Sequence, residues 1–296
     1  MCGIVGLFLK DSALAPRLGA LLSEMLVTMT DRGPDSAGIA LYGPVAPGRV
    51  KLVIQTGARG GFAGVEGALA EALAGPLAFR VKDSHAVAEI DAEDEPAART
   101  LLATRPELRL LSAGEAIEIY KEVGLPRDVA ARFGISGMAG SHGIGHTRMA
   151  TESAVTTLGA HPFSTGADQC LVHNGSLSNH HNLRRRLARA GVSVQTENDS
   201  EVAAAYLSWR MSQGASLGEA LEAGLSDLDG FFTFVVGTRD GFGVVRDPIA
   251  CKPAVMAETD AYVAFGSEYR ALVGLPDIEA AHVWEPEPAT VYFWKH

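Results

Sequence analysis

The sequence predicts an α+β protein in which predominantly antiparallel sheets are covered by helices. Apolar runs of strand length lie near both ends of the chain, at residues 4–8 and again from residue 231 onward. Between them, apolar side chains recur every three or four residues, as on one buried helix face, at residues 202–209 and 217–225. Strands at both ends with helices between them indicate sheets whose outer faces carry helices.

The N-terminal elements follow in order. Residues 4–8 form a buried strand, and a helix follows it. The glycine and proline of D-R-G-P-D-S-A-G at residues 31–38 force a turn after this helix, and residues 37–42 form a second buried strand. The apolar face of the helix comprises Leu18, Leu21, Leu22, Met25 and Met29.

Residues 44–140 differ in character and are expected to form a small α+β insertion within a main domain of residues 2–296. The insertion contains no cluster of nucleophile, base and acid. We expect His85 and the acidic run 91–95 to lie on its solvated surface. The expected elements are strands at 50–55 and 86–90 and helices at 65–74, 96–104 and 113–123.

The main domain resumes near residue 145. A strand at 170–172 runs into H-N-G-S at 173–176, and Asn179 is expected to cap a helix that carries Leu183 and Leu187. The stretch T-E-N-D-S-E-V at 196–202 opens the next helix. The remaining strands are expected at 231–237, 243–246, 261–265 and 289–294.

Composition narrows the class of protein. The chain has 296 residues and a formal net charge of −10, which argues against a general binder of nucleic acid or of anionic membranes. No apolar run approaches the roughly 18–20 residues that span a bilayer, and the N-terminus lacks the features of a secretory signal. Cys2, Cys170 and Cys251 form neither a disulfide framework nor a metal-binding pair, so we expect a cytoplasmic protein without a metal site.

The opening residues M-C-G-I-V-G are the first candidate for chemistry. If Met1 is removed, Cys2 carries both a thiol and a free α-amine. The unperturbed pKa of such an amine is about 7.7–8.0, so it can accept the thiol proton near neutral pH. A cysteine before an apolar strand is also common in inert proteins, so the rest of the chain must decide between the two interpretations.

Downstream residues supply the other parts of such a site. Asn174 can offer a side-chain N–H and Gly175 a backbone N–H to one oxyanion, although Asn-Gly is also an ordinary turn. Arg148 can hold a carboxylate, and Asp199 can receive an ammonium or simply offset a helix dipole. Together the last two match the charged ends of a free α-amino acid, and the substrate that fits is glutamine.

The motifs resemble those of class II glutamine amidotransferases, the family with N-terminal-nucleophile glutaminase domains. That resemblance implies a four-layer αββα N-terminal-nucleophile hydrolase sandwich with the small insertion. It covers residues 2 to about 272 apart from the insertion, and makes 2–296 the amidotransferase domain. The motifs are M-C-G-I-V-G, D-R-G-P-D-S-A-G, G-H-T-R-x-A-T, H-P-F, H-N-G, T-E-N-D-S-E, R-D-P-x-x-C-K-P at 246–253 and A-F-G-S-E at 264–268.

The resemblance assigns roles by position. Cys2 is the nucleophile, and Asn174 and Gly175 form the oxyanion hole. Arg148 binds the substrate carboxylate and Asp199 its amino group. The further expected substrate-binding residues are Arg32 and Gly33 in a loop that closes over glutamine, and Thr151 and His161 in the pocket wall, where His161 can instead be purely structural.

Two departures bear on the branch of the family. Met149 stands where some relatives have an aromatic residue, and Glu152-Ser153 replaces a His-Gly pair. Both count against the sugar-phosphate branch. The chain ends at residue 296, where relatives begin a synthase domain, so the ammonia acceptor is expected on a separate subunit.

The length and the insertion resemble the glutaminase subunit of glutamate-synthase-like complexes, with the N-methylglutamate synthase type as the nearest example. This chain then needs no cofactor, and FMN and iron–sulfur clusters are expected on the partner subunits. Two alternatives stay open. One is an N-terminal-cysteine amidase for another amide, which would not need Arg148 and Asp199; the other is a non-catalytic regulatory subunit with the same fold.

Overall fold

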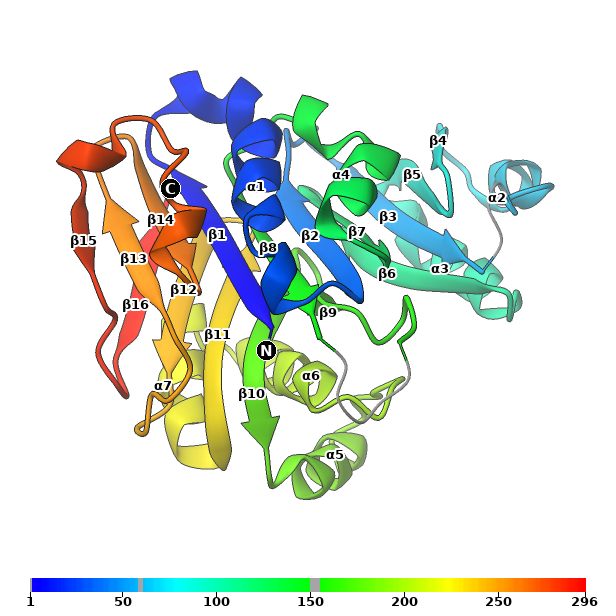
Figure 1. The fold of residues 1–296 in the computed structure, drawn as a ribbon. Coiled ribbons are helices and arrows are strands. Elements are labelled where there is room, and N and C mark those ends of the chain that lie inside the picture. The colour runs from blue at the N-terminus through cyan, green and yellow to red at the C-terminus, as the bar shows by residue number, and fades with distance from the viewer. Residues whose placement is uncertain (1, 58–60, 150–154) are drawn as a thin grey trace.

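The computed structural model describes residues 2–57, 61–149 and 155–296, which build two large stacked sheets covered by helices on both outer faces (Figure 1). All the strand pairs are antiparallel among these residues, as the sequence predicts. The first large sheet has the order β15 (His282–Trp284), β13 (Val255–Glu258), β14 (Tyr262–Gly266), β1 (Gly3–Leu9), β8 (His142–Arg148), β2 (Ser36–Tyr42), β7 (Ile117–Val123). The second has the order β16 (Val291–Lys295), β12 (Gly241–Arg246), β11 (Gly230–Thr238), β10 (Gln169–Leu177), β9 (Phe163–Gly166).

Three apolar cores separate four layers. Side chains alternate along β1, so Val5, Leu7 and Leu9 pack toward α1 (Leu18–Val27) and α4 (Pro126–Phe133). Ile4 and Phe8 point the other way, into the core between the two sheets. The second sheet packs its far face on α5 (His180–Arg189), α6 (Asp199–Ser212) and α7 (Leu217–Asp227). This is the predicted αββα arrangement.

A third, four-stranded sheet extends to one side of this body (Figure 1). It has the order β4 (Ala78–Lys82), β5 (His85–Asp91), β3 (Arg49–Thr56), β6 (Leu108–Gly114). The helices α2 (Val65–Ala72) and α3 (Glu95–Ala103) pack on it around their own small core. Short 3₁₀ turns in the described residues are η1 (Ser12–Arg17), η2 (Thr30–Arg32), η3 (Ala92–Asp94), η4 (Ile135–Gly137), η5 (Tyr269–Ala271) and η6 (Ile278–Ala280).

The predicted helix at 113–123 is wrong. Residues 108–114 form β6, a strand at the edge of the small sheet, and β7 pairs along its whole length with β2 of the main sheet. The side chains of Ile-Glu-Ile in β7 alternate between buried and half-buried, which is the two-residue period of a strand. The expected segment 44–140 thus contains β7 and α4, which belong to the main body.

His85 is the second error, because it is fully buried rather than solvated. Its ring lies 4.5 Å from that of Phe133 and 5.9 Å from that of Tyr120, and its Nδ1 lies 3.1 Å from Ser84 Oγ. Burial lowers the pKa of His85 to about 3. Asn179 does precede α5, but its side chain caps no helical N–H and instead donates to Asp227 O at 2.8 Å.

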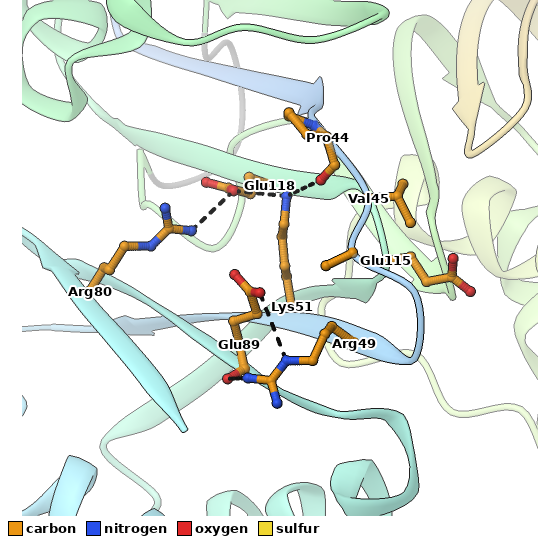
Figure 2. Close-up of a pocket in the computed structure, with 9 residues that line it drawn as sticks. Pro44, Val45, Arg49, Lys51, Arg80, Glu89, Glu115 and Glu118 are labelled. Carbon is orange, nitrogen blue, oxygen red and sulfur yellow. Dashed lines mark hydrogen bonds and ion pairs between the residues drawn. The ribbon is translucent and has the colours of Figure 1, made fainter. Parts of the chain in front are cut away.

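Charged side chains join the small sheet to the main sheet around a cavity of about 310 Å³ (Figure 2). Lys51 of β3 reaches across to β7, where its Nζ lies 3.3 Å from Glu118 Oε1 and donates to Pro44 O at 3.2 Å. Arg80 of β4 approaches the same carboxylate oxygen at 3.5 Å. Cations from two strands of the small sheet, β3 and β4, therefore meet one carboxylate of β7. In the described residues, no helix is long and apolar enough to cross a membrane.

Candidate active site

Cys2 precedes β1, an inner strand of the main sheet, and is partly exposed. The motif A-F-G-S-E at 264–268 secures this end of the chain. Ile4 N donates to Ser267 Oγ at 2.9 Å, and Ser267 N donates back to Ile4 O at 2.9 Å. These bonds fix the backbone next to the thiol.

Arg32 anchors Cys2 directly. Its Nε donates to Cys2 O at 3.0 Å, and its Nη1 forms an ion pair with Glu268 Oε1 at 2.5 Å. The hydrogen bond from Arg32 holds the pKa of the Glu268 carboxyl below its usual range. Arg32 was predicted in a loop that closes over the substrate, and in this structure it is buried against the backbone of Cys2.

Asn174 and Gly175 end up beside Cys2 because β10 runs along the second sheet toward it. Asn174 Nδ2 donates to Cys2 O at 3.4 Å. Gly175 has φ +155°, and a Cβ at this position would lie 2.0 Å from Phe231 O and 2.7 Å from His173 Nε2. Only glycine fits here, so the backbone of this donor candidate is closely confined.

A cavity of about 530 Å³ brings the predicted residues together. Arg148 ends β8 and its Nη1 donates to Gly159 O at 3.2 Å. Asp199 begins α6, where its Oδ2 accepts from Leu177 N at 2.9 Å and its Oδ1 from Ser200 Oγ at 3.2 Å. The predicted residues that line this cavity are Cys2, Arg148, His161, Asn174, Gly175 and Asp199.

Two predicted residues support the cavity from outside, and one cannot be placed. Arg32 contacts Cys2 as described above, and Gly33 lies against the end of β8. A Cβ on Gly33 would lie 2.5 Å from the carbonyl carbon of Arg148, so glycine lets this loop approach the arginine. Thr151, together with Glu152 and Ser153, lies outside the described residues.

Three buried histidines lie together beside the cavity: His161 and His173 line it, and His146 packs behind them. His146 and His161 stack with ring centres 4.0 Å apart, and His146 Nε2 lies 3.2 Å from His173 O. Burial lowers the pKa of His146 to about 3 and that of His161 well below its usual value. His173 Nδ1 lies 2.9 Å from Ser200 Oγ, which links it to Asp199.

Sequence reasoning did not assign His146 or His173 to the site, nor Ser267 or Glu268. All four stand inside motifs that were identified, namely G-H-T-R, H-N-G and A-F-G-S-E. Their position within those motifs was the available signal. Their function as supports appears only when the strands are paired.

The four-layer αββα fold is that of the class II glutamine amidotransferases. The sequence model of the glutamine amidotransferase domain matches residues 146–274. The chain is 68% identical over 298 residues to the glutamine amidotransferase-like protein GlxB of Rhizobium meliloti, covering 100% of this chain and 99% of that protein. It is 32% identical over 314 residues to a putative glutamine amidotransferase of Methanothermobacter thermautotrophicus, covering 99% of each. This chain belongs to the class II glutamine amidotransferase family.

Solved structures show the same fold. Glutamine phosphoribosylpyrophosphate amidotransferase from B. subtilis superposes with a TM-score of 0.62 at 19% identity, over 99% of this chain and 47% of that one. A structure described as the allosteric regulatory enzyme of purine biosynthesis gives a TM-score of 0.65 at 20% identity, again over 99% and 47%. The chain spans about half the length of these two proteins, and the likeness concerns the fold alone.

Proposed function

We propose that this protein is a glutaminase that hydrolyses L-glutamine to glutamate and ammonia through a γ-glutamyl thioester on Cys2. One observation carries the proposal: Cys2, Asn174 and Gly175 share one cavity with Arg148 and Asp199. The cavity thus combines a thiol and two N–H donors with a cation and an anion. A free amino acid with a side-chain amide fits this set of groups.

The proposed reaction begins with the mature N-terminus. The α-amine of Cys2 accepts the thiol proton, and the thiolate attacks the carbon of the side-chain amide. Asn174 Nδ2 and the Gly175 N–H stabilise the tetrahedral oxyanion, a contribution for which the loss of one donor costs about 10²–10³ in rate. The protonated amine gives its proton to the departing ammonia. Water then hydrolyses the thioester to glutamate and the free thiol.

Substrate selection depends on the two charged residues. Arg148 is held toward the cavity by Gly159 O and can bind the α-carboxylate in a bidentate manner. Asp199 keeps its carboxylate at the start of α6 through Leu177 N and can receive the α-ammonium, with Gly175 sharing that contact. An amidase for apolar amides has no use for such a pair, which favours glutamine over the amidase alternative.

The acceptor of the ammonia is proposed to be a separate synthase subunit in the cytoplasm. The glutamate-synthase-like complexes, including the N-methylglutamate synthase type, are the proposed class, with FMN and iron–sulfur clusters on the partner chains. Large apolar side chains are exposed at the Cys2 end of both sheets, namely Met149, Phe231, Ile249 and Tyr269. Met149 lines the cavity, Phe231 pairs with Ser176, which also lines it, and Tyr269 follows Glu268, so a partner that covers these three side chains would lie beside the cavity.

The test uses the purified chain with its N-terminus defined by mass spectrometry. We expect loss of Met1, glutamate release from glutamine, and loss of that activity in Cys2→Ala. The same protein is offered asparagine and apolar acyl amides. Cleavage of apolar amides with glutamine untouched would identify the amidase. A retained Met1 and no turnover, even with the partner complex added, would identify the non-catalytic subunit.

A further inference from the structure

Lys121 of β7 is a buried cation close to the cavity but not on it. Its side chain is 4% exposed. Its Nζ donates to three backbone carbonyls, those of Leu158 at 3.3 Å, Ala160 at 2.7 Å and Pro162 at 3.2 Å. An ammonium has three N–H donors, so all of them are used on one short segment. The ammonium also lies 4.5 Å from the centre of the Phe163 ring.

Lys51 shows what an ordinary buried lysine looks like in this protein. It has a carboxylate partner, Glu118, at 3.3 Å (Figure 2). Within the described part of the chain, Lys121 has no carboxylate within ion-pair distance. Burial lowers the pKa of Lys121 to about 7, and Glu201 of α6 offsets this only in part. Burying a cation on neutral carbonyls costs stability, and an apolar side chain at this position would avoid that cost.

The segment held by Lys121, residues 158–162, is a wall of the cavity. Leu158, Gly159 and His161 line it. The carbonyls of residues 158, 160 and 162 face Lys121, whereas the carbonyl of Gly159 between them accepts from Arg148 Nη1 at 3.2 Å. The same few residues therefore connect Lys121 to Arg148.

Gly38 makes this packing possible. It pairs with Lys121 across β2 and β7. A Cβ on Gly38 would lie 2.0 Å from His161 O and 2.6 Å from Lys121 Cβ. Backbone of the segment thus rests directly on β2 next to the lysine. The contacts of Gly38 and Lys121 together fix the distance between the segment 158–162 and the sheet.

We propose that Lys121 is a positioning residue for glutamine: it fixes the segment 158–162 and thereby orients Arg148 toward the substrate carboxylate. This inference rests on the proposed function. Lys121 does not touch the cavity, so it acts on substrate affinity rather than on the reacting atoms. Thiol chemistry at Cys2 that needs no carboxylate contact is independent of it.

The test compares Lys121→Met with Lys51→Met, a control that removes the buried lysine between β3 and β7. We expect Lys121→Met to raise KM for glutamine about tenfold, as for loss of a well-oriented charged contact, with kcat changed less than about threefold. Inactivation by a diazoketone analogue of glutamine should slow by a similar factor. Alkylation of Cys2 by iodoacetamide should keep its rate. Lys51→Met should leave all four quantities unchanged.

A double-mutant cycle shows whether the effect passes through Arg148. In an Arg148→Ala background, Lys121→Met should change KM by less than about twofold, since coupled residues are non-additive. Additive effects, an unchanged KM, or an equal slowing of both reagents would overturn the inference. If Lys121→Met does not fold, Lys121→Gln carries the same test, because it keeps two N–H donors and should give an intermediate KM. Failure of the wild-type protein to hydrolyse glutamine would instead overturn the proposed function.

Discussion

Glu268→Gln tests whether the Arg32–Glu268 pair positions Cys2, the proposed nucleophile. The carboxylate of Glu268 lies 2.5 Å from Arg32 Nη1, and Arg32 in turn holds Cys2 O at 3.0 Å. Arg32 is 8% exposed and Glu268 is 33% exposed, so the pair is partly screened by solvent. Breaking a fully buried pair costs 3–5 kcal/mol, and with this screening we expect a loss of about 1–2 kcal/mol in unfolding free energy.

A matched control exists in the same sheet. The side chains of Lys10 and Glu258 also approach to 2.5 Å, and Glu258 is likewise 33% exposed. Lys10 differs from Arg32 because it is 29% exposed and donates to Glu258 and Thr259 rather than to Cys2. Glu258→Gln should cost about 0–1 kcal/mol, as usual for surface pairs. Any greater effect of Glu268→Gln therefore reports the burial of Arg32 and its bond to Cys2.

The assays are guanidinium unfolding and glutamate release at pH 7.5. For Glu268→Gln we expect kcat to fall about 10–100-fold, because a displaced Cys2 loses its alignment with Asn174 and Gly175. Glu258→Gln should keep the wild-type kcat. The reasoning is refuted if the two variants lose equal stability and Glu268→Gln turns over glutamine at the wild-type rate. An increased KM alone would also contradict it.

Three further predictions follow. Gly175→Ala should lower kcat at least about 10²-fold, because a Cβ 2.0 Å from Phe231 O must displace the proposed oxyanion donor. The control Gly191→Ala has open space around its Cβ, so it should keep kcat and lower the free energy of unfolding by about 1 kcal/mol because of its φ of +79°. Asp199→Asn should raise KM for glutamine about 10–100-fold in steady-state assays, because it removes the charge that faces the ammonium, and a wild-type KM would rule that contact out. Burial lowers the pKa of His85, His142 and His146 to about 3, so the unfolded chain binds more protons than the folded one below pH 6.5. As the pH falls from about 6 to 5, each of these histidines should lower the free energy of unfolding by about 1.4 kcal/mol per pH unit. Denaturant melts at the two pH values should show that His85→Gln removes about a third of the combined loss from these three histidines.

The sequence predicts the main-body elements well where an apolar run is long or a helix has a clear face. It fails at Ile117–Val123, because apolar residues at 117, 120 and 123 also satisfy the three-residue step of a helix. Pairing with β2 decides the matter, and that pairing is invisible in a local window. His85 fails for the same reason, since Tyr120 and Phe133, which enclose it, come from distant elements.

The candidate site divides in a similar way. The five residues that can be proposed from their chemistry each carry a group that the proposed reaction requires: Cys2, Asn174, Gly175, Arg148 and Asp199. The residues that position the site cannot be predicted from their chemistry alone. Glu268 contacts Arg32 across 236 residues of sequence, and Lys121 Nζ donates to three backbone carbonyls of the segment 158–162. Every residue has a backbone carbonyl, so the residue types of the segment give no indication of such a contact.

The pairing of β1 has a consequence for the order in which the site is assembled. β1 precedes both of its neighbours in the chain, since β8 ends at Arg148 and β14 begins at Tyr262. Ser267 and Glu268, which secure Ile4 and Arg32, are made later still. β8 becomes available about halfway along the chain, but β14, Ser267 and Glu268 complete the surroundings of Cys2 only when roughly nine-tenths of these residues have emerged from the ribosome. The contacts that hold Cys2 in place therefore form late in synthesis, after most of the chain that supplies them has been made.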